Sequence, residues 1–147
     1  MNELVEALKS LHASNFALYL KAHNFHWNVE GDDFPMYHSF FSDYYEEVFD
    51  ATDVIAELIR TLDEYAPGSL SEFLKRSSVK DETGHLTTDQ MIRILFADNQ
   101  SVIAELTAAY KIAERFSEFG ISNALQDRIT AHKKHAWMLR SMTKGNE

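Results

Sequence analysis

The feature that most constrains the fold is where glycine and proline interrupt an otherwise helix-compatible chain. The 147 residues include only five glycines and two prolines. They fall at Gly31, Pro35, Pro67, Gly68, Gly84, Gly120 and Gly145. Because both residue types destabilise helix interiors, these positions leave four long segments in which helices can form. No alternating β pattern of useful length, internal repeat or low-complexity tract occurs in the sequence.

Each of the four segments carries apolar residues at helical spacing. We expect helices over about residues 2–28, 33–62, 87–120 and from 122 onward, with Gly120 ending the third and Ser122 capping the fourth. Their inner stripes are Leu4, Leu8, Leu11, Leu18 and Phe25; Phe41, Tyr44, Val48, Ile55, Ile59 and Leu62; Met91, Leu95, Val102, Leu106 and Tyr110; and Leu125, Ile129, Ala136 and Leu139.

Two helix starts carry capping signals. Thr87 and Gln90 have the spacing of a capping box at the start of the third long helix. Ser69 and Glu72 repeat that spacing, which predicts a short additional helix through Leu74.

Four helices of about 25–30 residues, each ~40 Å long, most simply form a four-helix bundle. The link over about residues 63–86 is too long for a tight turn between antiparallel helices. It fits a crossover along the length of the bundle, as in ferritin-like topologies. We therefore predict an all-α, ferritin-like four-helix bundle, formed as a single domain by residues 1–147.

Composition excludes several kinds of site and partner. With Lys+Arg 14 against Asp+Glu 23, the net charge of −9 disfavours attraction to nucleic acid or anionic lipid and suits a protein that handles cations. The absence of cysteine excludes disulfides, thiolate zinc sites, cysteine nucleophiles and iron–sulfur clusters. No signal-peptide pattern and no apolar run of ~18 residues occurs. We expect a cytoplasmic protein that does not associate with membranes.

Two histidines and two carboxylates stand out by their spacing. His26 and His38 flank the first predicted turn, and Asp53 and Glu57 lie one helical turn apart on the second helix. Carboxylates at that spacing repel each other unless a cation lies nearby. Imidazole nitrogen and carboxylate oxygen together suit iron, zinc or manganese. The alternative is that the histidines only form hydrogen bonds between helices and that the carboxylates form a solvated face.

Helix geometry divides these four residues between subunits. His38 and Asp53 belong to one predicted helix and are fifteen residues apart, so their backbones are separated by roughly 22 Å along its axis. They cannot bind one ion within one subunit. If the four residues form one site, the histidines of one chain must meet the carboxylates of another, and a two-fold axis then generates two such sites per dimer.

These residues also resemble a known family. The run H-W-N-V-x-G-x-x-F-x-x-x-H, followed by D-x-x-A-E, is similar to the Dps family, the DNA-protection-during-starvation miniferritins of the ferritin-like superfamily. The matching positions are His26, Trp27, Asn28, Val29, Gly31, Phe34, His38, Asp53, Ala56 and Glu57. On the last helix, the segment from His132 to Arg140 resembles the family's H-E-K-x-x-W-M-L-R, with Lys133 in place of the glutamate.

The resemblance implies a hollow dodecamer that protects against oxidative stress. Such a particle binds ferrous iron at ferroxidase centres shared across two-fold interfaces, oxidises it with hydrogen peroxide or oxygen, and stores ferric mineral inside. By this resemblance, His26 and His38 are iron ligands from one subunit, and Asp53 and Glu57 are ligands from its partner. Trp27 then lies beside the iron and intercepts oxidising equivalents, the alternative being an apolar anchor at a helix end.

This chain departs from the family pattern at the metal site. Four residues after the second histidine the family usually carries Asp or Glu, where this sequence has Ser42. Asp43 is next along the helix, but a one-residue step turns a side chain by ~100°, so it does not simply substitute. We therefore expect a weaker second iron position.

Two further expectations concern DNA and the remaining histidines. Only Lys9 is basic before Lys21, so phosphate contacts are few and DNA binding is expected to be weak or absent. His132 and His135 have the spacing to bind a surface ion, but the intervening lysines oppose a cation there. The alternative overall function is a metal-sequestering or DNA-coating helical oligomer without efficient ferroxidase turnover.

Overall fold

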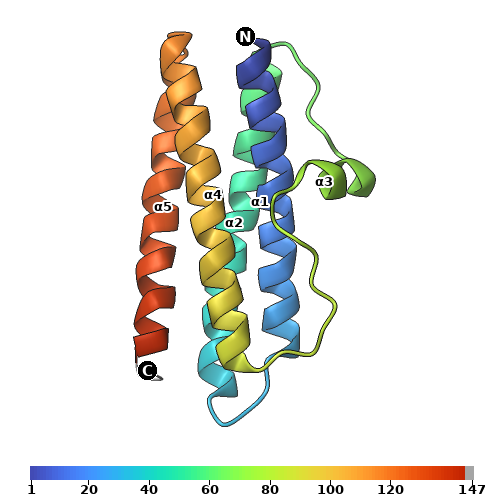
Figure 1. Cartoon of the computed structure of the whole chain (residues 1–147), viewed down its shortest axis with the longest axis vertical. Coiled ribbons are helices and arrows are strands. Elements are labelled where there is room, and N and C mark those ends of the chain that lie inside the picture. Colours follow the sequence, from blue (N-terminus) through green and yellow to red (C-terminus); the bar gives the residue numbers. More distant parts are fainter. Residues whose placement is uncertain (145–147) are drawn as a thin grey trace.

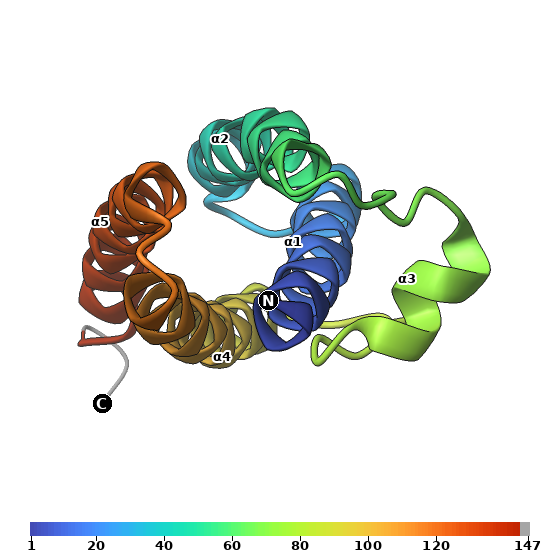
Figure 2. The same cartoon turned by 90° about the horizontal axis from the view of Figure 1, so that it is seen from above.

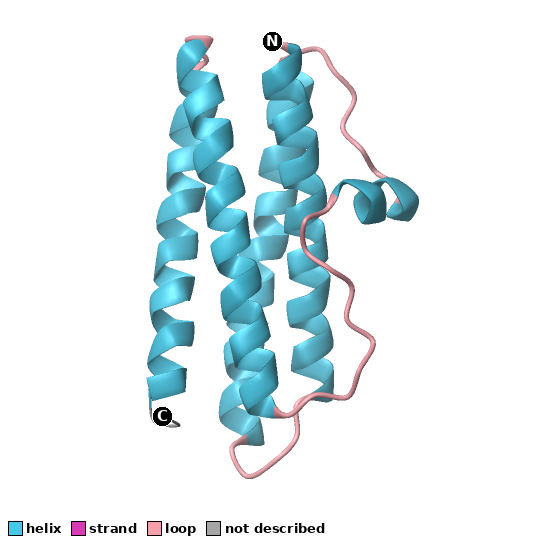
Figure 3. Ribbon diagram, viewed as in Figure 1, coloured by secondary structure: helices cyan, strands magenta, loops and turns pink. Residues whose placement is uncertain are grey.

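The computed structural model of the chain describes residues 1–144. Gly145 and the end of the expected domain lie outside the described residues. The described part folds into helices and loops without a strand (Figure 3). The helices are α1 (Asn2–Asn28), α2 (Phe34–Thr61), α3 (Leu70–Arg76), α4 (Thr88–Arg115) and α5 (Phe119–Thr143). The predicted all-α class, with four long helices and a short one between the second and third, is confirmed.

The long helices form two antiparallel pairs, α1 with α2 and α4 with α5, and α1 also packs along α4 (Figure 1). The connection from α2 to α4 runs along the outside of α1 from one end of the bundle to the other. Seen from above, α3 lies outside the ring of four helices and next to α1 (Figure 2). This crossover is the predicted ferritin-like arrangement. None of the described helices is long and apolar enough to cross a membrane.

The bundle interior is filled by the apolar stripes that the helical spacing predicted. All of the expected inner residues are buried except Leu62, Tyr110 and Ile129, which are partly buried and pack against the core. Burial of one large aliphatic side chain contributes about 1.5–3 kcal/mol, so these stripes determine which helix faces meet.

The starts of α4 and α3 follow their predicted signals to different extents. At α4 the capping box is complete, because Thr87 Oγ1 accepts from the Gln90 N–H while the Gln90 side chain accepts from the Thr87 N–H. At α3, Ser69 Oγ accepts from the Glu72 N–H at 3.4 Å. The Glu72 carboxylate bonds to the Ser69 hydroxyl and not to its N–H, so only half of a capping box forms.

The predicted boundary between the last two helices is wrong. α4 ends at Arg115, and Gly120 lies in the first turn of α5. The chain reverses at Ser117, whose φ of 57° is left-handed, and the Glu118 N–H bonds back to the last turn of α4. Ser122 lies inside α5, where its hydroxyl donates to the Glu118 carbonyl instead of capping the helix. A serine adopts the left-handed conformation that glycine usually provides at a helix end.

A buried polar network connects α2, α4 and α5. Arg128 donates to both carboxylate oxygens of Glu47, and its Nη2 also donates to His132 Nε2 at 3.1 Å. His132 Nδ1 then donates to Asn99 Oδ1 at 2.8 Å, and His135 Nε2 donates to Glu47 Oε1 at 2.8 Å. Both histidines are buried, and their bonds within this network give them a structural role.

The network shifts the pKa of two of its members. Burial raises the pKa of Glu47, but hydrogen bonds from His135 and Arg128 and the Arg128 charge outweigh it, so that this pKa lies well below its usual range. Burial and the adjacent Arg128 charge lower the pKa of His132 to about 3. Both groups therefore stabilise the fold at neutral pH, and both contributions are lost as the pH falls.

Replacement of His132 by glutamine should flatten the acid dependence of stability. The unfolded chain protonates this imidazole near 6.5, whereas the folded protein does so only at about 3. Between these values the unfolded state binds more protons, so acidification removes up to ~1.4 kcal/mol of stability per pH unit through this group. Free energies of unfolding from pH 7 to 5, at one protein concentration, should fall less steeply for His132→Gln than for wild type.

The matched control for this measurement is His85→Gln, which changes an exposed histidine in the crossover. This variant should keep the wild-type slope. Equal slopes for wild type and both variants would contradict the role assigned to His132.

Candidate metal centre

The connection between α1 and α2 brings His26 and His38 together. Val29, the first residue of this loop, is buried, and Gly31 has a φ of 120°, which L side chains rarely adopt. Phe34 begins α2 and stacks on the His38 ring with centroids 4.9 Å apart. Residues 29–33 thus place the last turn of α1 beside the first two turns of α2.

The two histidines hold each other through their backbones. His26 Nδ1 lies 2.7 Å from the His38 carbonyl oxygen, and His38 Nδ1 lies 2.7 Å from the His26 carbonyl oxygen. The rings stack with centroids 3.7 Å apart. Because a carbonyl only accepts, both Nδ1 atoms carry a proton, and Nε2 is the ring atom of each histidine that can bind a metal through its lone pair. This is the tautomer and orientation that a metal-ligating histidine requires.

Asp53 and Glu57 lie farther along α2, with both side chains exposed. They follow His38 by fifteen and nineteen residues, which places them roughly 22–28 Å along the helix. In residues 1–144 no group of three or more histidine, aspartate or glutamate side chains is placed to hold one metal ion. The structure therefore brings the two histidines together and puts the two carboxylates on one helix face, but it separates the two pairs.

Ser42 lies one turn beyond His38, at the position where the sequence departs from the family pattern. Its hydroxyl donates to Glu46 Oε1 at 3.4 Å, whereas Asp43 is exposed. Glu46 was not among the residues expected here, although its i, i+4 spacing from Ser42 was an available signal.

An array of rings adjoins the histidine pair. Trp27, 58% exposed, stacks on His23 with centroids 3.9 Å apart, and Tyr45 stacks on the other side at 3.8 Å. The Tyr45 ring also meets His26 edge-on at 5.2 Å, and Tyr19 Oη lies 2.9 Å from His23 Nδ1. Of these rings, only Trp27 and the ligand candidate His26 were expected at the site from the sequence. The i, i+4 spacing of residues 19, 23 and 27 on α1 was the signal that could have indicated the rest.

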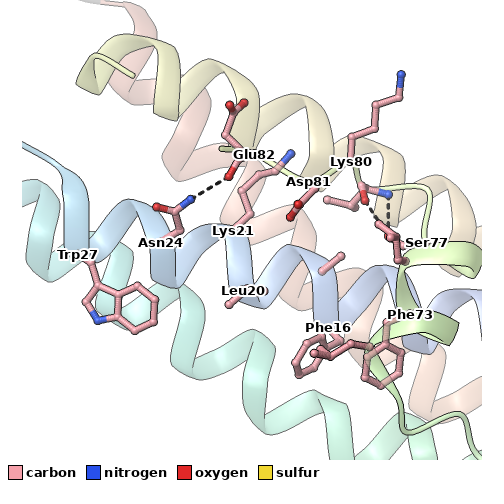
Figure 4. A pocket seen from close by; sticks show the side chains of 14 residues that line it. Phe16, Leu20, Lys21, Asn24, Trp27, Phe73, Ser77, Lys80, Asp81 and Glu82 are labelled. Carbon is pink, nitrogen blue, oxygen red and sulfur yellow. Dashed lines mark hydrogen bonds between the residues drawn. The ribbon is translucent and has the colours of Figure 1, made fainter. Parts of the chain in front are cut away.

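An apolar groove opens between α1 and the crossover (Figure 4). Its volume is about 440 Å³, and its lining includes Leu20 and Trp27 of α1 and Phe73 of α3. Leu70 and Leu74, which also line it, are 74% and 72% exposed. Contiguous exposed apolar surface of this kind is typical of an interaction face. Because Trp27 belongs both to the groove and to the ring array, this face adjoins the histidine pair.

Comparisons with known proteins agree with this architecture. A family model described as a ferritin-like domain matches residues 5–145. The chain is 31% identical over 139 residues to DNA protection during starvation protein 2 of Bacillus anthracis, with 95% of each chain covered. It is 31% identical over 137 residues to the DNA protection during starvation protein of Helicobacter pylori strain J99, with 92% of this chain and 95% of the relative covered.

Solved structures give the same assignment. The fold matches the Dps protein from Vibrio cholerae O1 with a TM-score of 0.94 and 26% identity, covering 97% of this chain and 90% of the other. That protein is described as a member of a broad superfamily of ferritin-like diiron-carboxylate proteins. Dps from Staphylococcus aureus gives a TM-score of 0.93 and 30% identity, with 97% and 95% of the two chains covered. The chain therefore belongs to the ferritin-like family and, within it, to the DNA-protection-during-starvation (Dps) proteins.

Proposed function

We propose that the protein is a ferroxidase and iron-storage miniferritin, which oxidises ferrous iron at sites shared between two subunits and keeps ferric mineral inside a hollow dodecamer. The observation that carries this proposal is the reciprocal hydrogen bonding of His26 and His38, which leaves both Nε2 atoms available to a metal. The diiron-carboxylate description of the Vibrio cholerae relative supports iron as that metal. Consumption of ferrous iron together with an oxidant protects against oxidative damage.

The ligands divide between two chains. His26 and His38 of one subunit bind an iron ion together with Asp53 and Glu57 of the partner, and the two-fold axis repeats the site. Two features support this division. The rise of α2 keeps the histidine pair and the carboxylate pair apart within one chain. The apolar groove beside the histidines is exposed surface of the kind that a partner subunit buries. Phe49, on α2 between the two half-sites, is also 50% exposed.

The mixed donor set suits the oxidation of ferrous iron. Neutral imidazole binds ferrous iron readily, and carboxylates stabilise the ferric ion that forms, so less oxidising power is needed to remove the electron. Two ferrous ions together supply the two electrons that reduce one hydrogen peroxide to two waters, with two protons taken up. No hydroxyl radical is released in that reaction. Oxygen is the alternative oxidant.

A second function, metal sequestration without efficient turnover, is favoured by one observation. Ser42 provides a hydroxyl where a carboxylate would strengthen a second iron position, and one iron per centre cannot supply both electrons. The rate of oxidation separates the two functions, because a sequestering protein oxidises iron no faster than buffer does. Strong DNA coating is not part of either proposal, since the net charge is −9.

Replacement of His38 by alanine should abolish saturable ferrous binding and slow peroxide-driven oxidation. At metal sites, loss of a hydrogen bond that supports a ligand lowers metal affinity or activity by roughly tenfold or more. Loss of the ligand itself should lower them by at least that factor. Anaerobic ferrous titration and stopped-flow ferric absorbance measure both effects, with native mass recorded for each protein. His85→Ala, at an exposed loop histidine, is the control. Wild-type rates in His38→Ala would reject the site, and buffer rates in an assembled wild type would favour sequestration.

Complementation between two inactive variants should show whether the site is shared. Subunits with His26→Ala and His38→Ala lack one half-site, and subunits with Asp53→Ala and Glu57→Ala lack the other. In a mixed dimer one of the two sites is intact, so random reassembly of an equal mixture should restore about one quarter of the wild-type centres. Recovered ferrous binding after refolding the mixture measures this. No recovery from correctly assembled particles would contradict a site built from two chains.

A further inference from the structure

The hydrogen bond between Tyr19 and His23 is not used by the iron site described above. Tyr19 Oη lies 2.9 Å from His23 Nδ1. The imidazole is held between the Trp27 ring at 3.9 Å and the Tyr45 ring at 3.8 Å, which limits its rotation. The phenol and its acceptor are therefore kept in one geometry.

The chemistry of the two side chains allows the phenol to donate in this hydrogen bond. Burial and the neighbouring Tyr45 raise the pKa of Tyr19, so that its hydroxyl stays protonated at neutral pH. With the His23 ring proton on Nε2, the hydroxyl donates and Nδ1 accepts. A phenol that already donates to an imidazole can lose an electron and its proton in one step, because the proton has an acceptor within bonding distance.

Ring contacts connect this pair to the candidate iron ligands. Tyr45 stacks on His23 and meets His26 edge-on at 5.2 Å, and the His23 and His26 ring centroids are 5.9 Å apart. Tyr19 precedes His26 by seven residues, two turns or ~10 Å along one face of α1. Aromatic and imidazole rings therefore lie along the short path between Tyr19 and the candidate iron ligands.

The other oxidisable rings nearby lack a proton acceptor. Within residues 1–144 neither Trp27 Nε1 nor Tyr45 Oη forms a hydrogen bond to another group of the chain. Oxidation of either leaves its proton without a positioned base, whereas the Tyr19 proton can move to His23. This difference selects Tyr19 as the ring from which an electron is most easily removed.

We propose that Tyr19 is a proton-coupled electron donor to the iron centre, with His23 as the acceptor of its proton. The proposal rests on the function proposed above and applies when only one ferrous ion occupies a centre as peroxide arrives. The iron and Tyr19 then give one electron each to hydrogen peroxide, and the O–O bond breaks. The products are one ferric ion, two hydroxide ions, a neutral Tyr19 radical and a protonated His23, which returns its proton to one hydroxide. Hydroxyl radical is not released.

Freeze-quench electron paramagnetic resonance tests this assignment. Assembled protein holding one ferrous ion per centre is mixed anaerobically with hydrogen peroxide, and ferric absorbance is followed on the same time scale. Wild type should give a tyrosyl signal that narrows when the tyrosine rings are deuterated. The signal should be lost in Tyr19→Phe and kept in Tyr110→Phe, the control on α4. A spin trap should capture several-fold more hydroxyl radical from Tyr19→Phe than from wild type.

A second variant tests the proton acceptor. His23→Phe keeps a ring between Trp27 and Tyr45 but removes the base, so the radical yield at a fixed quench time should fall by at least about tenfold. Native mass and oxidation at excess ferrous iron should match wild type, which separates this effect from misfolding.

The possible results separate this proposal from the proposed function. Ferric absorbance without a tyrosyl signal, or a signal that persists in Tyr19→Phe, overturns the role of Tyr19 and leaves the ferroxidase intact. Unchanged yield in His23→Phe overturns the role of His23. Absence of ferric absorbance above buffer overturns the ferroxidase and this proposal together.

Discussion

The rise of an α-helix is the constraint on which the rest of this molecule depends. α2 is continuous from Phe34 to Thr61, and no glycine interrupts it. It therefore holds His38 and Asp53 at a fixed separation of roughly 22 Å, and no movement within one subunit can bring them to one ion. In the proposed arrangement, each chain therefore carries two half-sites, each of which another chain completes.

Inside the bundle, the guanidinium of Arg128 occupies the position beside Glu47 and His132 that a metal ion would need. In many four-helix bundles, carboxylates and histidines of facing helices converge on a metal in the core. Here Glu47, His132 and His135 lie together, but the guanidinium of Arg128 bonds to Glu47 and His132, and His135 donates to Glu47. A partly buried ion pair of this kind is costly to break from one side, because the remaining charge is left without a partner. The iron chemistry proposed for this protein therefore lies on the outer face, where within residues 1–144 the Nε2 atoms of His26 and His38 form no hydrogen bond.

In the proposed function, assembly and chemistry share that outer face. The apolar groove between α1 and the crossover adjoins the histidine pair, and Trp27 belongs to both. A partner that covers the groove removes exposed apolar surface from water and, in the proposed arrangement, brings its carboxylates to the histidines. The backbone bonds that orient the two imidazoles lie within one chain. Less ordering is then required when the site is completed, which favours binding.

Much of the fold could be predicted from the pattern of neighbouring residues in the sequence. The bounds of α1 and α2, the capping box at Thr87, the buried stripes and the separation of the half-sites all follow from helix period, helix rise and capping chemistry, which are properties of neighbouring residues. The turn between α4 and α5 could not be predicted from local pattern, because its left-handed residue is Ser117 and not a glycine. The packing of the two helices that it joins determines this backbone conformation.

Within the candidate site, the sequence by itself determined which residue types lie on which helix, and that one chain cannot bring all four ligands together. Only the tertiary structure decided that each histidine bonds to the other's carbonyl, that His23 lies between Trp27 and Tyr45, and that Arg128 fills the space beside Glu47. These contacts join different helices. They depend on how far each helix is rotated and shifted against its neighbour, which is set by packing of the whole core and not by the spacing of residues along one helix.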